Sequence, residues 1–264
     1  MNPDALIDPL FQIPFLVGLI LAAVLPLIGV LLRLRNEWLA ALGLAHLAGA
    51  SALAGLAFGI PAVAGGPMGA AAGALLKTFG RIQGNTIYAA MILVGWSTTL
   101  LLAANTTLGS SMGHALVEGQ LYFAGTAQLV AASLLMLLTI ALLPKLMPHL
   151  IRTEFFPGQG QANHRFAWRW HLGFDLLVAV GMAVGTGTVG LMGAFALVFL
   201  PPWLAFRTAP SWRGTLIIAL VTGTLGYLIA FALALYFDQP FGPALVALLL
   251  IGMALVETAR GRSI

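Results

Sequence analysis

Apolar residues along this chain form a series of long runs that short polar segments separate. An α-helix rises about 1.5 Å per residue, so a run of about 20 apolar residues spans the roughly 30 Å hydrocarbon core of a bilayer. We therefore expect an all-α, polytopic integral membrane protein with eight or nine transmembrane helices, in which residues 1–264 form a single transmembrane domain. The candidate ranges are 11–32, 38–59, 61–77, 86–104, 122–144, 171–189, 191–206, 214–236 and 242–257.

The pair of runs within residues 171–206 is the least defined, because Gly185, Gly187, Gly190 and Gly193 interrupt it. Glycines at these positions fit a tight hairpin, one broken helix, or short helices that meet inside the membrane. All three arrangements remain open from the sequence.

The distribution of basic residues predicts the orientation. If the N-terminus lies outside, all twelve lysines and arginines fall at the cytoplasmic ends of the predicted spans, as the positive-inside rule requires, and the C-terminus is cytoplasmic. These residues are Arg33, Arg35, Lys77, Arg81, Lys145, Arg152, Arg165, Arg169, Arg207, Arg213, Arg260 and Arg262. Asp175, near the inner end of a span, is interpreted as a structural residue that reaches the interface.

Composition agrees with a membrane protein and excludes several other classes. Hydrophobic residues make up 60% of the chain and charged residues 8%, whereas soluble domains have about 25% charged residues. The sequence pI is about 10.0, but the basic residues are scattered rather than clustered, which disfavours nucleic-acid binding. The chain has no cysteine, so any metal would be bound by nitrogen or oxygen ligands. A phosphate-binding P-loop motif is also absent, so ATP hydrolysis of that type would need another polypeptide.

Two separated segments near the C-terminus carry a family resemblance. Residues 191–197 (LMGAFAL) and 200–203 (LPPW) are followed by residues 236–243 (YFDQPFGP) at the start of the last span. These segments resemble, in order and spacing, the membrane permease subunits of ABC-type zinc and manganese importers, the ABC-3 family. The resemblance implies a multi-pass permease of the bacterial inner membrane. It also implies three kinds of partner: a second permease copy in a homodimer, two cytoplasmic ABC ATPase subunits, and an extracytoplasmic metal-binding protein.

The N-terminal half resembles the same family around His46. Arg33 and Arg35 precede Ala45 and His46, where the family has a basic pair followed by the pattern DxLxHAxLxG. The family aspartate, four residues before the histidine, is Leu42 in this chain. His46 lies roughly 16 Å along a helix from Arg35, near the middle of the bilayer, so it is the first candidate metal ligand. A neutral histidine that hydrogen-bonds between helices is the structural alternative.

Three further residues are candidate ligands on the outer side. Asp238 lies in the Pro/Gly-rich turn before the last span, where it could meet an arriving cation or cap the helix that follows. His114 and Glu118 are four residues apart in the outer loop and would share one face if that loop were helical. The alternative for this second pair is an ordinary solvated loop.

The inner loop at residues 148–170 is the candidate coupling loop. Glu154, Phe155, Phe156 and Gly160 resemble the family segment that includes the coupling helix docked into the ATPase. Pro157 and Gly158 would distort a helix here. The alternative is a basic loop held against anionic lipid by Arg152, Arg165 and Arg169.

The expected function is that of an importer permease working by alternating access. Under this hypothesis the chain is not an enzyme and binds no covalent cofactor; zinc or manganese is the transported substrate, and ATP acts only through the partner ATPase. Three alternatives remain: a permease for a metal chelate or small organic solute, an ion-coupled secondary carrier, and a degenerate permease that pairs with a different permease subunit.

Overall fold

The computed structural model describes residues 9–80, 84–106, 119–156 and 167–261. Helices make up the structure in these ranges, and no strand occurs in them, which confirms the predicted all-α class. Two short 3-10 helices, η2 (Pro9–Phe11) and η3 (Leu121–Phe123), lie beside the long ones. The long helices are α1 (Gln12–Leu34), α2 (Trp38–Ala57), α3 (Ala62–Phe79), α4 (Asn85–Asn105), α6 (Thr126–Phe155), α8 (Ala167–Val189), α9 (Leu191–Thr208), α10 (Trp212–Phe237) and α11 (Phe241–Gly261).

Each of the nine predicted spans corresponds to one of these helices. Within the described ranges, eight of them are long and apolar enough to cross a membrane. The remaining one is α3, whose many glycines and alanines and whose Lys77 lower its hydropathy. The prediction of eight or nine spanning helices is therefore confirmed, whereas the side of the membrane that each end faces stays a prediction.

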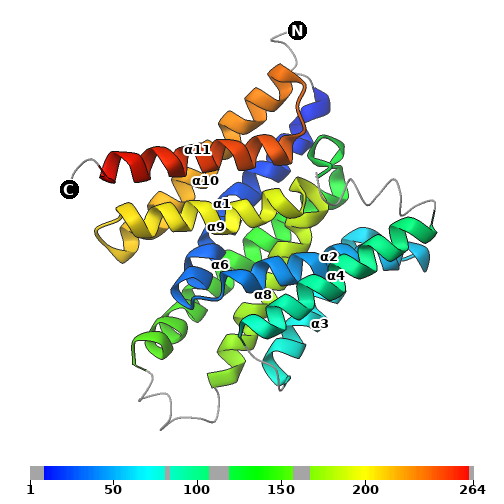
Figure 1. Ribbon diagram of the computed structural model, residues 1–264, viewed down its shortest axis with the longest axis horizontal. Helices are drawn as coiled ribbons and strands as arrows, with labels where there is room; N and C mark the ends of the chain where they lie inside the picture. Colours follow the sequence, from blue (N-terminus) through cyan, green and yellow to red (C-terminus); the bar gives the residue numbers. More distant parts are fainter. Residues whose placement is uncertain (1–8, 81–83, 107–118, 157–166, 262–264) are drawn as a thin grey trace.

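The helices form two groups joined by α6 and α8 (Figure 1). On one side α1 packs against α9 and α10, with α11 against α9 and α10; on the other, α2 packs against α3 and α4. α8 contacts α2, α3, α6 and α9, so it joins the two groups. Buried apolar side chains from all of these long helices form one continuous core.

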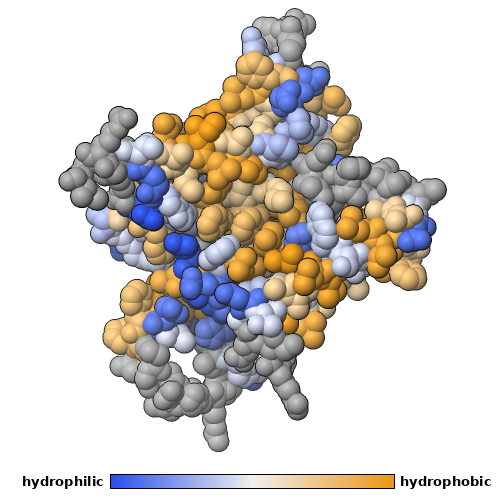
Figure 2. Space-filling model, in the orientation of Figure 1, coloured by the Kyte–Doolittle hydropathy of each residue, from blue (hydrophilic) through white to orange (hydrophobic). Residues whose placement is uncertain are grey.

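Glycines allow the helices to approach closely, as is typical of membrane helix bundles. A Cβ atom on Gly29 of α1 would overlap the backbone of Val198 in α9, and one on Gly69 of α3 would overlap the side chain of Ser51 in α2. Large apolar side chains instead face outward from α4, α6, α10 and α11, among them Leu93, Leu134 and Ile229. Figure 2 shows such residues over much of one face of the molecule, as expected of a surface that contacts lipid.

The glycine-rich region at 171–206 forms a tight helical hairpin. α8 ends at Val189 and α9 begins at Leu191, with Gly190 alone between them at φ 84°. A positive φ is readily adopted by glycine, so Gly190 permits the sharp turn. The N–H of Gln120 donates to the carbonyl of Thr188 at 2.9 Å, which attaches the start of the η3 segment to this turn.

Candidate functional site

His46 lies in the middle of α2 with its side chain directed toward α4. The residue is only 8% exposed, and its ring contacts Trp96 edge-to-face, with ring centroids 5.5 Å apart and planes at 79°. A Cβ atom on Gly95 would lie 2.7 Å from the His46 Cβ, so the absence of a side chain at Gly95 makes room for the histidine. The predicted ligand is therefore a buried imidazole at a helix–helix contact.

The neighbourhood of His46 supplies few further metal ligands. Leu42, one turn earlier on α2, is partly buried and packs against the apolar core. Among the described residues, no group of three or more histidine, cysteine, aspartate and glutamate side chains could hold a metal ion. The described part of one chain therefore supplies an incomplete metal site at His46.

Asp238 is the C-cap residue of α10 and lies in the turn before α11, which begins at Phe241. It has left-handed backbone angles, φ 52° and ψ 49°, and its N–H donates to the carbonyl of Ala234. Its side chain is exposed. Burial, together with the negative charge of Asp238, raises the pKa of Tyr122 in η3 to about 12, so the carboxylate lies near Tyr122.

His46 and Asp238 lie on helices with different neighbours. α2 packs against α3, α4, α8 and α9, whereas α10 packs against α1, α9 and α11. In Figure 1 the turn after α10 lies at the top, near the N-terminus, and α2 crosses the middle of the molecule. The other two outer candidates, His114 and Glu118, lie outside the described residues.

The candidate coupling residues lie at the end of α6. Glu154 and Phe155 are its last residues and Phe156 is its C-cap; Gly160 lies outside the described residues. Both phenylalanines are exposed, Phe155 at 63% and Phe156 at 57%. α6 has 30 residues, or roughly 45 Å at 1.5 Å per residue, so its last turns extend beyond a 30 Å hydrocarbon layer and into the predicted inner loop.

Two contacts attach this end of α6 to the rest of the bundle. The His149 ring stacks on Trp170 of α8, with centroids 3.9 Å apart and planes at 9°. The indole N–H of Trp212, the first residue of α10, donates to Sδ of Met147 at 3.4 Å. These contacts connect the last turns of α6 to the starts of α8 and α10.

A four-residue ion-pair cluster lies where α1, α2, α3 and α8 meet. The Asp175 Oδ1 atom accepts from Lys77 Nζ at 2.7 Å and from Arg35 Nη1 at 3.2 Å. The Glu37 Oε2 atom contacts Arg35 Nη2 at 2.7 Å and Lys77 Nζ at 2.9 Å. Asp175 is 3% exposed and is buried in this cluster. Its ion pairs fit the structural role that the sequence analysis predicted, and its distance from the membrane interface stays a prediction.

The charges in the cluster balance, with two cations and two carboxylates. Burial raises the pKa of Glu37, but the positive charges of Arg35 and Lys77, together with hydrogen bonds from Lys77 and Tyr88, lower it more. The net pKa lies below the ordinary value, so Glu37 is ionised at neutral pH. Sequence reasoning missed this cluster; the signal available was a charged residue at the same end of each of these spans.

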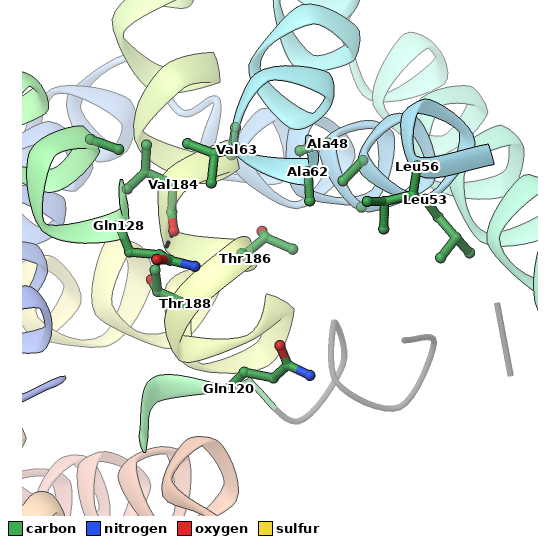
Figure 3. Close-up of a pocket in the computed structure, with 15 residues that line it drawn as sticks. Ala48, Leu53, Leu56, Ala62, Val63, Gln120, Gln128, Val184, Thr186 and Thr188 are labelled. Atoms are coloured by element: carbon green, nitrogen blue, oxygen red, sulfur yellow. Dashed lines mark hydrogen bonds between the residues drawn. The ribbon is translucent and has the colours of Figure 1, made fainter. Parts of the chain in front are cut away.

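A cavity of about 170 Å³ lies at the opposite ends of α2 and α8 from the ion-pair cluster. Four uncharged polar side chains contribute to its wall: Gln120, Gln128 of α6, and Thr186 and Thr188 of α8 (Figure 3). The rest of the wall consists of glycine and apolar residues of α2, α3, α6 and α8. No charged residue lines the cavity among the described residues. This cavity could not be predicted from the sequence, because its wall comes from segments far apart along the chain.

Comparison with known proteins identifies the family. The sequence model of the ABC 3 transport family matches residues 8–260. The chain belongs to the ABC 3 transport family. The family predicted from the sequence is thereby confirmed, and the chain is a multi-pass permease subunit of an ABC transporter. Permeases of this family are not themselves ATPases, and membership implies a partner ATPase and a substrate-binding protein.

Two solved structures show the same fold. PsaBC from Streptococcus pneumoniae in complex with Fab matches with a TM-score of 0.81 at 14% identity, over 94% of this chain and 90% of that chain. A structure described as a metal-chelate type ABC transporter in an inward-facing conformation matches with a TM-score of 0.68 at 16% identity, over 94% of this chain and 85% of that one. Among curated proteins, none has a sequence that matches this ABC 3 permease.

Proposed function

We propose that this ABC 3 permease carries a divalent transition metal, zinc or manganese, across the bacterial inner membrane by alternating access. The observation that carries the proposal is His46, a buried imidazole in the middle of an apolar helix. An ionisable group is costly to place at such a depth in the membrane, so its presence there usually indicates a function. Neutral imidazole is a good ligand for zinc and accepts manganese less readily.

The metal site of this proposal is completed by a second copy of the chain. His46 supplies one ligand, and the described part of the chain offers no cluster that would supply the others. Trp96, which contacts His46, is itself 43% exposed, so His46 lies one side chain away from the surface of the chain. A homodimer with the pathway between its copies would bring two imidazoles to one site. A different permease subunit could also complete the site, by supplying a carboxylate ligand of its own.

The exposed end of α6 supports the expected coupling to the ATPase. Phe155 and Phe156 present apolar surface beyond the predicted membrane boundary, and aromatic side chains often anchor protein interfaces. In this proposal two ATPase subunits dock there, and ATP binding moves α8 and α10 through the contacts of His149 and Trp212. Zinc or manganese is delivered at the opposite end by an extracytoplasmic metal-binding protein, near Asp238.

A metal chelate or small organic solute is the second candidate substrate. Leu42 removes the carboxylate that would neutralise a bare cation, and the cavity between α2 and α8 has uncharged polar walls. Both features suit a cargo whose charge is already shielded. The ion-coupled secondary carrier is no longer favoured, because family membership assigns the chain to an ATP-driven transporter.

ATP-dependent uptake tests the proposed function. The permease would be reconstituted into proteoliposomes with its partner ATPase and substrate-binding protein, and the uptake of radioactive zinc and manganese would be measured. We expect uptake of one metal in the wild type, and its loss in His46→Ala. Ile229→Ala, at an exposed position on α10, is the control and should transport normally. Uptake that survives His46→Ala unchanged would remove His46 from the pathway.

A further inference from the structure

The cavity between α2, α3, α6 and α8 is separate from the candidate metal site. Its α2 wall consists of Ala48, Gly49, Ala52, Leu53 and Leu56. His46 is not among the lining residues and instead contacts Trp96 of α4. The predicted orientation places the cavity at the outer end of the bundle, where an imported substrate arrives.

Thr186 has a hydroxyl group in this cavity wall that lacks a partner. Four threonines are buried among the described residues, and three of them donate to a backbone carbonyl one turn earlier: Thr139 to Leu135 at 2.8 Å, Thr188 to Val184 at 2.7 Å and Thr215 to Ser211 at 3.1 Å. Thr186 is 1% exposed, and its Oγ1 atom makes no hydrogen bond within the described structure. Buried polar groups are nearly always hydrogen-bonded, so an unpaired hydroxyl in a cavity wall points to a partner that a ligand would supply.

The side chain of Gln128 is a second polar group in the wall, and its amide N–H groups can donate to a ligand. The Gln128 Oε1 atom accepts from the N–H of Gly125 at 3.0 Å in the first turn of α6. This contact fixes the carboxamide, and its NH₂ group remains able to donate. Figure 3 shows Thr186 on α8 and Gln128 on α6 among the side chains around the cavity. Together they offer a hydroxyl, which donates and accepts, and an amide donor.

Glycines keep the cavity open beside Thr186. A Cβ atom on Gly49 would lie 3.9 Å from Cγ2 of Thr186, in ordinary contact, and one on Gly187 would meet nothing within 4 Å. Neither glycine has a positive φ. Neither the backbone angles nor close neighbours require glycine at these two positions, and alanine would fit at both. The two glycines leave space in front of Thr186 that alanine side chains would partly fill.

The chemistry of the wall defines the class of ligand. The described residues of the wall offer a bare divalent cation no carboxylate or imidazole in exchange for its hydration shell, and such an exchange is strongly unfavourable. A volume of about 170 Å³ is smaller than that of typical drug-sized sites. We propose that the cavity binds a small uncharged organic group that hydrogen-bonds to Thr186 and Gln128. The group is either a free solute or the organic ligand of a metal chelate; the chelate form rests on the proposed function, and binding of the free molecule does not.

Calorimetric titration of the full-length chain in lipid nanodiscs tests this site. The probes are maltol, which is a neutral single-ring hydroxypyranone, its uncharged two-to-one zinc complex, and zinc chloride. We expect maltol or its complex to bind, and Thr186→Val to weaken that binding by about three- to tenfold, as loss of one hydrogen bond predicts. Thr215→Val removes a buried hydroxyl outside the cavity and should bind as the wild type does.

Each outcome of the titration has a definite meaning. Tighter binding of the zinc complex than of free maltol identifies a chelate, and equal or weaker binding of the complex identifies an organic solute. The proposal is overturned if neither binds the wild type, or if Thr186→Val binds both as well as the wild type does. Binding is measured without ATP or transport, so failure of metal uptake in proteoliposomes would leave this result unaffected.

A cysteine-labelling experiment checks the same site without relying on affinity. The chain has no native cysteine, so Thr186→Cys introduces a single thiol. We expect methyl methanethiosulfonate, a small neutral reagent, to modify this thiol. Maltol should lower the rate of modification in proportion to the fraction of sites that it occupies, as measured by calorimetry. Thr139→Cys, at a buried position of α6 outside the cavity wall, should be unreactive. Modification of Thr186→Cys that maltol does not slow would overturn the proposal.

Discussion

Lys77 and Asp175, which are 98 residues apart in sequence, form a buried ion pair with Nζ and Oδ1 2.7 Å apart. This pair joins the end of α3 to the start of α8, and Arg35 extends it to the end of α1. α3 is the one long helix of the described ranges that is not among the candidate membrane spans, and these charges contribute to holding it in the bundle. The cluster lies at the end of the bundle predicted to be cytoplasmic.

Asp175→Asn should destabilise the protein by about 3 kcal/mol or more, because removing one partner leaves a buried charge uncompensated. Thermal unfolding in nanodiscs would measure the change. The double variant Asp175→Asn with Lys77→Met should recover part of the loss, since it removes both charges. Glu257→Gln breaks the exposed pair with Arg207 and should cost less than about 1 kcal/mol. Equal losses in the single and double variants would contradict the assigned pairing.

Glu37 should make stability depend on acidity. Its pKa in the folded protein lies below the ordinary value of 4.5, so the folded state favours the ionised form. The stability that this provides is fully present above pH 4.5 and is lost as the pH falls through the lower, folded-state pKa. Glu37→Gln should therefore flatten part of the decline in unfolding temperature between pH 6 and pH 3. A decline identical to that of the wild type would show that Glu37 gains nothing from Arg35 and Lys77.

Leu42→Asp should create a stronger metal site beside His46. Residues four apart share one face of a helix, and a carboxylate about 4 Å from a cation contributes roughly 4 kcal/mol of attraction at an effective dielectric constant of 20, partly offset by desolvation. We expect zinc affinity of the chain in nanodiscs to rise by at least about tenfold. Leu42→Asn has the same shape without the charge and should give a much smaller gain. If both variants bind zinc as the wild type does, His46 does not face a metal pathway.

The exposed pair Phe155 and Phe156 should anchor the ATPase. Replacing both by serine should weaken association of the permease with its ATPase by about 30-fold, as loss of roughly 2 kcal/mol of interface contact predicts. Quantitative co-purification and ATPase stimulation would report the effect. Phe123→Ser changes an exposed phenylalanine near the opposite end of α6 and should leave association intact. Unaltered association in the double variant would place the ATPase on another surface.

The sequence determined the helices and the family of this protein. Apolar runs near 20 residues predict spanning helices because a helix satisfies its own backbone hydrogen bonds in lipid, and each predicted range corresponds to an observed helix. The two C-terminal segments indicated the family that the full-length match then identified. His46 could also be singled out, because an ionisable residue in the middle of an apolar run is conspicuous.

The tertiary structure decided what these helices bring together. The three arrangements left open by the glycines at 185–193 reduced to one hairpin only when the packing of α8 on α9 was known. The ion-pair cluster joins Arg35, Lys77 and Asp175 from three distant segments, and the cavity at Thr186 is enclosed by four helices. Helical periodicity relates residues three or four apart in the sequence. The ion pairs and the cavity instead depend on how closely whole helices approach one another. Glycines such as Gly29 and Gly95 permit that close approach, but the local sequence pattern does not show which helices will pack together.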